Sequence, residues 1–167
     1  MASGKSSLAA DLAQRTGWRV ASFGDYVRSQ TPRELWNDRT RLQTTGATLI
    51  EELGYREFCL RALAHANIAT STVPCIVDGV RHVEILEALR SFFAPRFVGL
   101  VFVHVPETVR RKRLAIQGVR RRDIERLQRH STEADPQAQL PVMADLTVEG
   151  DGSAVTDILA WSRQYCR

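Results

Sequence analysis

The chain has 167 residues, of which 44% are hydrophobic and 25% are charged, and its formal net charge is +4. This length and balance are typical of one globular domain that buries a substantial core. No apolar run reaches the roughly 18 residues of a membrane span, and no basic segment followed by an apolar one resembles a signal peptide, so we expect a cytoplasmic protein without a membrane partner.

The first feature along the chain is the segment MASGKSSLAADLA. Its residues Gly4-Lys5-Ser6 match the end of the phosphate-binding P-loop pattern G-x-x-x-x-G-K-[ST]. The leucines and alanines at positions 8, 9, 12 and 13 share one face of a helix. This spacing predicts that a helix runs from Lys5 to about Arg15, as a P-loop requires.

A P-loop binds phosphate through its backbone N–H groups and the N-terminus of its helix, while its lysine adds a full charge and its serine binds Mg²⁺. Lys5 is one of only two lysines in a chain whose positive charge comes almost entirely from arginine. We therefore expect ATP and Mg²⁺ as cofactors. The phosphates are expected to contact Gly4, Lys5, Ser6 and Ser7, and the metal ion Ser6.

The first glycine of the P-loop pattern, five positions before Gly4, is not in the sequence, and neither is the strand that precedes a P-loop. We expect that this strand is missing from the chain because the start was assigned too late or the chain was shortened. The alternative is a chain that begins here and has lost its catalytic competence.

The first half of the chain continues with alternating strand and helix patterns. The short apolar stretch from Val20 to Phe23 predicts a strand, and a long helical region follows from about Pro32 to Ala66, broken near Gly54. The segment VPCIV at 73–77, which ends at Asp78, predicts a second strand. The helix expected after it has one apolar face, formed by Val83, Leu86, Leu89 and Phe93.

The second half repeats this alternation. The segment FVGLVFVHV at 97–105 is typical of a strand buried on both faces of a parallel sheet. Two arginine-rich helices are expected at about 107–117 and 121–130, and the segment ADLTVEGDG at 144–152 predicts a last strand and a loop. A closing helix contains Val155, Ile158, Leu159 and Trp161. The pattern predicts an α/β domain over 1–167, with a parallel sheet covered by helices on both faces.

Three further segments resemble kinase motifs. SFGDYVR at 22–28 is similar to the S-T-G-D-x-x-R segment of adenylate kinases, and VDGVR at 77–81 resembles their L-D-G-F-P-R segment. ADLTVEGDGS at 144–153 resembles the A-D-x-x-I-x-N-x-G-S run of dephospho-coenzyme A kinases. The chain therefore resembles P-loop kinases of the nucleoside monophosphate kinase superfamily. That resemblance implies a sheet of strand order 2-3-1-4-5, a helical acceptor-binding insert at about 24–70 and a short lid at about 110–130.

The resemblance also assigns roles to individual residues. Arg28 and Arg81 match arginines that hold the acceptor's phosphate, and Asp25 matches an aspartate that is either structural or a general base for a hydroxyl acceptor. Asp78 would hold Mg²⁺ opposite Ser6. The lid arginines would be Arg113, and Arg120 or Arg121. Phe23 replaces a family threonine that contacts the acceptor base, which makes adenylate a doubtful acceptor.

Together these features predict an ATP- and Mg²⁺-dependent small-molecule kinase that phosphorylates a nucleotide or a nucleotide-like acceptor. One alternative is a catalytically impaired nucleotide-binding module whose arginine surface binds a nucleic acid or a protein, and another is an ATPase or switch without a small acceptor. Location separates them: arginines that converge on the P-loop are a lid, whereas arginines spread over an outer helix face are a partner surface. We expect a small-molecule acceptor rather than a nucleic acid, and the sequence leaves the oligomeric state open.

Overall fold

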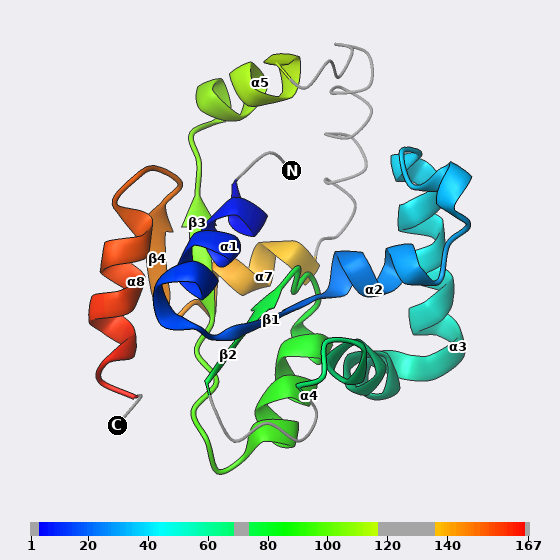
Figure 1. Ribbon diagram of the computed structural model, residues 1–167, viewed down its shortest axis with the longest axis horizontal. Coiled ribbons are helices and arrows are strands. Elements are labelled where there is room, and N and C mark those ends of the chain that lie inside the picture. Colours follow the sequence, from blue (N-terminus) through cyan, green and yellow to red (C-terminus); the bar gives the residue numbers. More distant parts are fainter. Residues whose placement is uncertain (1–3, 69–73, 117–135, 166–167) are drawn as a thin grey trace. The chain divides into compact units, whose positions relative to one another are not determined.

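The computed structural model describes residues 4–68, 74–116 and 136–165 (Figure 1). The chain divides into two compact units. The terminal unit consists of Met1–Leu8 and Gly99–Arg167. The central unit consists of Ala9–Val98. Helix α1 (Lys5–Thr16) begins in the first and continues into the second, and its buried residues Ala9 and Leu12 lie on the predicted apolar face.

The central unit contains two parallel strands and the helices that pack on them. In chain order after α1, its elements are β1 (Arg19–Ser22), α2 (Phe23–Ser29), the short 3₁₀ helix η1 (Arg33–Leu35), α3 (Arg39–His65), β2 (Cys75–Asp78) and α4 (Val83–Phe93). Helix α3 packs against α2 and α4. The predicted strands and long helical region are thus present, and the parallel pairing of β1 with β2 is confirmed.

Phe23 is not part of the strand that the sequence predicted; it is the first residue of α2. The chain turns into this helix because Ser22 caps it: the Ser22 hydroxyl accepts a hydrogen bond from Asp25 N–H at 3.2 Å. Because Phe23 is apolar and directly follows the strand residues, the sequence pattern extended the predicted strand through it. The cap at Ser22 ends the strand one residue earlier. The spacing of apolar residues did not predict α2, although most of it lies in the helical insert at about 24–70 that the resemblance implied.

The core of the central unit is built around Phe23. This residue is 4% exposed, and its ring centroid lies 5.5 Å from that of Phe58 on α3. Tyr26 packs edge-on against the same Phe58 ring, also at 5.5 Å, and such tilted aromatic pairs are favourable beyond their buried area. Apolar side chains from α3 and α4 complete the cluster, among them Leu63, Ile85 and Leu89. The beginning of α2 is therefore fixed to α3.

Helix α3 changes direction at Gly54, where the sequence predicted a break. Gly54 has a φ of 73° and a ψ of 161°, which lie outside the helical region. At its N-terminus the Asp38 carboxylate accepts from Arg41 N–H at 3.1 Å. A residue with a Cβ rarely adopts the conformation of Gly54, so this glycine separates a first half, 39–53, from a second half, 55–65.

The terminal unit contains the second parallel pair. Its elements are β3 (Val101–His104), α5 (Glu107–Ile116), α7 (Pro136–Val142), β4 (Leu146–Glu149) and α8 (Ala154–Ser162). Strand β3 pairs in parallel with β4, and α8 packs beside β4 (Figure 1). The helix expected at 121–130 lies outside the described residues. Helix α7 was not predicted.

The strand expected at 97–105 is shorter and less buried than its sequence suggested. Phe97 is 48% exposed, His104 is exposed, and only Val103 of β3 is buried. The pairing with β4 starts beside Leu100, whose N–H donates to the Asp145 carboxylate at 2.7 Å. Residues 97–100 lie outside β3, although the Leu100 carbonyl accepts from Leu146 N–H at 3.2 Å. Hydrophobicity alone does not report where a strand begins.

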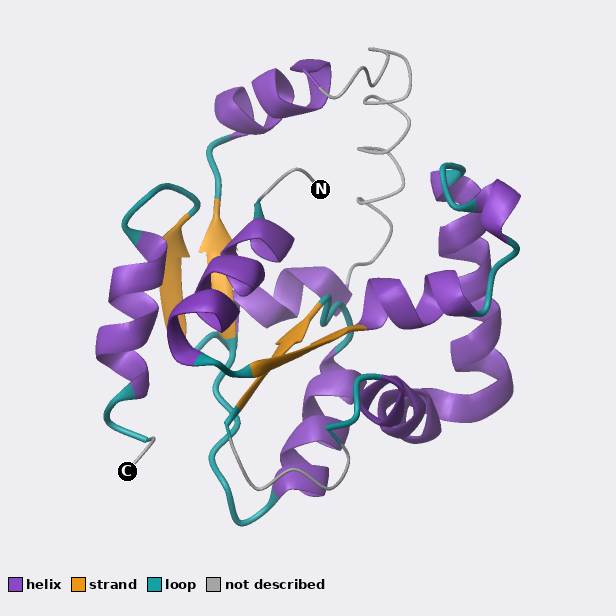
Figure 2. Cartoon of the chain, viewed as in Figure 1, coloured by secondary structure: helices purple, strands orange, loops and turns teal. Residues whose placement is uncertain are grey.

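The four strands of the described ranges form two parallel pairs (Figure 2). If β1 to β4 are counted as the second to fifth strands of the order 2-3-1-4-5, both pairs are neighbours in that order. A single sheet containing a further strand stays a prediction. Among the residues that the structure describes, no helix is both long and apolar enough to cross a membrane.

Candidate functional site

The predicted phosphate-binding residues lie where the chain enters α1. Gly4 has a φ of 78°, a left-handed conformation that favours glycine, and its carbonyl accepts from Leu8 N–H at 2.9 Å. Lys5, Ser6 and Ser7 form the first turn of α1 and are exposed. The first N–H groups of an α-helix have no carbonyl partner within the helix, and the helix dipole is positive at this end. This turn therefore suits an anion such as phosphate.

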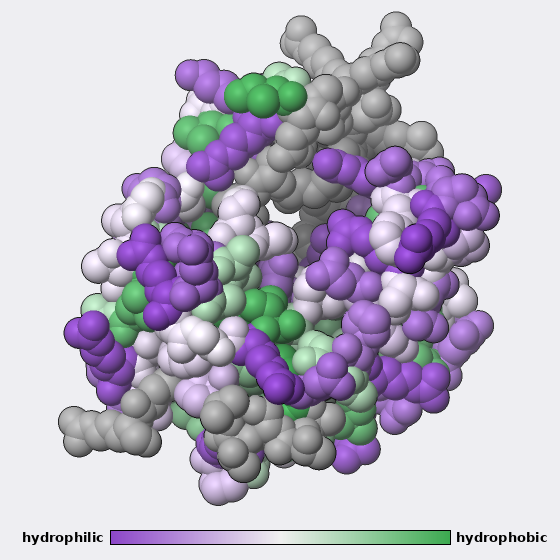
Figure 3. Space-filling view, viewed as in Figure 1, coloured by the Kyte–Doolittle hydropathy of each residue, from purple (hydrophilic) through white to green (hydrophobic). Residues whose placement is uncertain are grey.

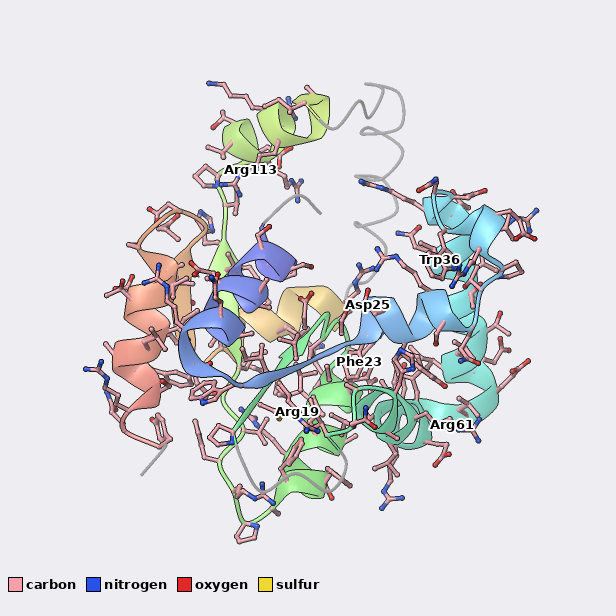
Figure 4. All side chains as sticks on the ribbon, in the orientation of Figure 1. Arg19, Phe23, Asp25, Trp36, Arg61 and Arg113 are labelled. Atoms are coloured by element: carbon pink, nitrogen blue, oxygen red, sulfur yellow. The ribbon has the colours of Figure 1, made fainter. Side chains whose placement is uncertain are left out.

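Arg113 on α5 lies against this turn (Figure 4). A Cβ atom placed on Gly4 would lie 3.5 Å from Arg113 Nη1, and Arg113 Nη2 donates to the Gly150 carbonyl at 2.7 Å. All three residues belong to the terminal unit. One guanidinium therefore connects the end of the P-loop pattern with the loop after β4.

The loop after β4 is held by its own hydrogen bonds. The Asp151 carboxylate accepts from Ser153 N–H at 2.9 Å and from the Ser153 hydroxyl at 2.8 Å. These bonds, the backbone one first, favour the ionised form and hold the pKa of Asp151 below its ordinary range. The segment that supplies the Gly150 carbonyl thus has a defined conformation. The loop belongs to the segment 144–153 that resembles a run of dephospho-coenzyme A kinases, although that resemblance did not single out Gly150.

The neighbouring charges on α5 are arranged differently from Arg113. Glu107 accepts from Arg111 at 3.0 Å and pairs with Arg110 at 2.6 Å. The hydrogen bond from Arg111, with the nearby charge of Arg110, lowers the pKa of Glu107. Arg110 and Arg111 therefore share a carboxylate of their own helix, whereas Arg113 reaches another segment.

The predicted acceptor residues gather at the carboxyl ends of β1 and β2. In the parallel register Ser22 lies opposite Asp78, and Asp25 and Arg28 follow on α2. Arg28 Nη1 donates to the Asp25 carboxylate at 2.7 Å, between two exposed side chains. Arg81 is exposed in the turn between β2 and α4. The fold thus places four predicted residues, Asp25, Arg28, Asp78 and Arg81, at or just after the ends of two neighbouring strands.

A pocket of about 490 Å³ lies beside α2 in the central unit. It contains Asp25 and Arg28 of the predicted set and does not contain Arg81. The pocket's other lining residues are Ser29, Thr31, Arg33, Trp36 and His65. All of these residues lie in the acceptor-binding insert expected at about 24–70. The sequence gave no role to Arg33 or His65, because neither belongs to a recognised motif.

The predicted magnesium ligands lie in different units, Ser6 in the terminal unit and Asp78 in the central unit. Within residues 4–68, 74–116 and 136–165, no group of three or more His, Cys, Asp or Glu could hold a metal ion. Mg²⁺ in phosphoryl-transfer sites takes only one or two protein ligands and otherwise binds water and phosphate, so Ser6 and Asp78 suit it chemically. Their joint role stays a prediction. Arg120 and Arg121 lie outside the described residues.

Comparison with known proteins adds a family. Residues 1–136, more than half of the chain, match the family model described as AAA domain. The chain is also 30% identical over 118 residues to the UPF0200 protein of Thermococcus gammatolerans (strain DSM 15229 / JCM 11827 / EJ3). That alignment covers 70% of this chain and 62% of the relative, so the chain spans less than two thirds of the relative's length.

Proposed function

Because the chain belongs to the AAA domain family, a family of P-loop NTPases, we propose that it is an ATP- and Mg²⁺-dependent kinase for a nucleotide or a nucleotide-like acceptor. The observation that carries this proposal is the position of Arg113. Its guanidinium lies beside Gly4 and donates to Gly150, so an arginine from α5 meets the phosphate-binding turn. A positive group at this position can neutralise charge on a transferring phosphoryl group.

Phosphoryl transfer needs little covalent help from a protein; it needs the two substrates held in line and the developing charge neutralised. Lys5 and the N–H groups of the first turn of α1 would hold the β- and γ-phosphates of ATP, and Arg113 would cover them. Bound Mg²⁺ would supply further neutralisation, with Ser6 and Asp78 as the protein residues that suit it.

Arg28 and Arg81 are the residues that would bind the acceptor's phosphate, since a guanidinium matches two oxygens of an anion at once. The hydrogen bond from Arg28 to Asp25 at 2.7 Å favours a positioning role for Asp25. A carboxylate that accepts a hydrogen bond from an arginine orients that arginine. The proposed acceptor is accordingly one that presents a phosphate.

The two alternatives make different demands on the arginines. In a nucleotide-binding module with a macromolecular partner, the arginines of α5 would serve an outer surface. Arg113 Nη1 lies 3.5 Å from the position that a Cβ on Gly4 would take, which favours the lid instead. An ATPase without an acceptor would have no use for a pocket beside Arg28, and a pocket of about 490 Å³ is present there. Both observations support the kinase.

The first test is Lys5→Ala. Removing a charge that acts mainly on the transition state should lower kcat for phosphoryl transfer by about a hundredfold or more, without unfolding the chain, because Lys5 is exposed. Transfer from ATP is measured against a panel of nucleoside monophosphates and dephospho-coenzyme A. Lys112→Ala is the matched control, since Lys112 is the other lysine and is also exposed on a helix.

The second test concerns the acceptor. Arg28→Ala and Arg81→Ala should each raise the KM for the acceptor by about tenfold or more, the usual effect of losing a hydrogen bond to a charged group, and should leave the KM for ATP nearly unchanged. Arg61→Ala is the control, because Arg61 is exposed and pairs with Glu57 outside the pocket. Unchanged kinetics in the variants of Lys5, Arg28 and Arg81 together would refute the proposed function.

A further inference from the structure

The pocket beside α2 has one aromatic wall. Trp36 is 38% exposed and is the only tryptophan, tyrosine or phenylalanine among the described residues that line the pocket. Its indole N–H donates to the Thr31 carbonyl at 2.9 Å, and this bond fixes the ring relative to the end of α2. The Thr31 side chain is itself anchored, because its hydroxyl donates to the Val27 carbonyl at 2.8 Å. The wall is therefore a positioned surface.

Arg33 lies over this ring. The centre of its guanidinium is 5.6 Å from the centroid of Trp36, within the range of a cation–π interaction. Among the described residues Arg33 forms no ion pair with a carboxylate. A planar cation and an indole thus lie together in the pocket.

The pocket follows α2 towards its C-terminal end: Asp25 lies in the first turn of the helix and Arg28 in its last turn. Trp36 lies beyond the end of the helix (Figure 4). The charges are two arginines against one aspartate, which leaves an excess of positive charge. The surface over α2 and η1 is largely hydrophilic (Figure 3).

We propose that the acceptor is a nucleotide whose base stacks on Trp36 and Arg33 while its phosphate is held by Arg28. This inference rests on the proposed function, because the ligand of the pocket is taken to be the acceptor. A flat aromatic base fits both a positioned indole and a guanidinium plane, two surfaces on which nucleic-acid bases stack. A sugar phosphate without a base could bind Arg28 but would have no ring to stack on Trp36.

The other aromatic side chains of this region are excluded as base contacts by burial. Phe23 is 4% exposed and Tyr26 is 5% exposed, and both are packed on Phe58 in the core. Phe23, which stands where the related kinases have a threonine that contacts the base, is therefore buried away from the pocket. Trp36 takes that role because η1 holds it at the pocket instead of in the core.

Binding without ATP tests the inference separately from catalysis. Nucleoside monophosphates, ribose 5-phosphate and inorganic phosphate are titrated into the full chain by calorimetry. We expect at least one nucleoside monophosphate to bind about tenfold or more tightly than ribose 5-phosphate, since stacking one base is worth that much. Equal affinities, or no binding by any of the three classes, would overturn the inference.

Two variants isolate the aromatic face. Trp36→Leu and Trp36→Phe both lose the hydrogen bond to Thr31, and only the second keeps an aromatic ring. Trp36→Leu should remove most of the preference for the nucleotide over ribose 5-phosphate, whereas Trp36→Phe should retain it. The same weak affinity in both variants would show that the hydrogen bond, and not stacking, maintains the site, and the inference would fall. Arg33→Ala should weaken nucleotide binding, while Arg61→Ala should not.

A transfer assay with ATP then distinguishes the two proposals. If a nucleoside monophosphate binds in a Trp36-dependent manner and is never phosphorylated, the pocket is a nucleotide site and the kinase assignment fails. If an acceptor is phosphorylated equally well by the wild type and by Trp36→Leu, the kinase stands and the inference fails.

Discussion

Arg113 shows how one residue can link distant parts of the sequence. Its two guanidinium nitrogens reach Gly4, near the start of the chain, and the Gly150 carbonyl, near its end. In phosphoryl transfer a single arginine that covers the phosphates contributes about 10³ to 10⁵ in rate where it has been measured. The sequence had named Arg113 from a pattern of arginines, and the contact with Gly4 gives that assignment a position.

We predict that Arg113→Ala lowers kcat for transfer by about a hundredfold or more and changes the thermal midpoint little, because the side chain is only partly buried. Steady-state kinetics and a thermal melt of the same sample measure the two effects. Arg111→Ala is the control: Arg111 lies two positions away and pairs with Glu107 on its own helix. Equal losses of activity in both variants would contradict a specific role for Arg113.

At the scale of one element, helix α3 contains two glycines, Gly46 and Gly54, whose backbone conformations predict different effects of substitution. Gly54 has a φ of 73° and a ψ of 161°, which only glycine adopts at low cost, whereas Gly46 lies in the first half of the helix, where a Cβ would meet Val27 at 3.6 Å, an ordinary contact. The same substitution should therefore have opposite effects at the two positions.

We predict that Gly54→Ala lowers the free energy of unfolding by about 1–3 kcal/mol, the usual cost of a strained backbone conformation. Gly46→Ala should raise it by up to about 1 kcal/mol, because alanine is the better helix former. Denaturant unfolding followed by circular dichroism compares the two. Stabilisation by both substitutions would mean that α3 is not interrupted at Gly54 in solution.

At the scale of the whole molecule, nucleotide binding is expected from the P-loop family and can be measured as a rise in the chain's thermal stability. A ligand that binds only the folded chain, present at about a hundred times its dissociation constant, adds roughly 2.7 kcal/mol. For a chain of this size that corresponds to a rise of about 5–10 °C in the thermal midpoint.

We therefore predict that ATP with Mg²⁺ raises the thermal midpoint of the wild type and that removing Mg²⁺ with EDTA diminishes the rise. Lys5→Ala should show little of it at the same ATP concentration, whereas Lys112→Ala should behave as the wild type. Differential scanning fluorimetry measures all four conditions. A rise of the same size in Lys5→Ala would remove Lys5 from the nucleotide site.

The sequence by itself determined the local patterns of this protein. The Gly-Lys-Ser turn before α1, the break at Gly54 and the alternation of strands with helices follow from backbone preferences and from the spacing of apolar residues, and both act over a few neighbouring positions. The same patterns overestimated the strand at 97–105, because hydrophobicity does not reveal where strand pairing starts.

Only the tertiary structure decided which side chains meet. The packing of elements places Arg113 beside Gly4 and buries Phe23 against Phe58. It also brings Arg33 and Trp36 to a pocket that Arg28 lines. Packing joins residues that are far apart in the chain, and no local preference specifies those contacts. The sequence thus predicted the residue types for phosphate chemistry, whereas only the fold shows that Phe23 is buried and that Trp36 is exposed at the pocket.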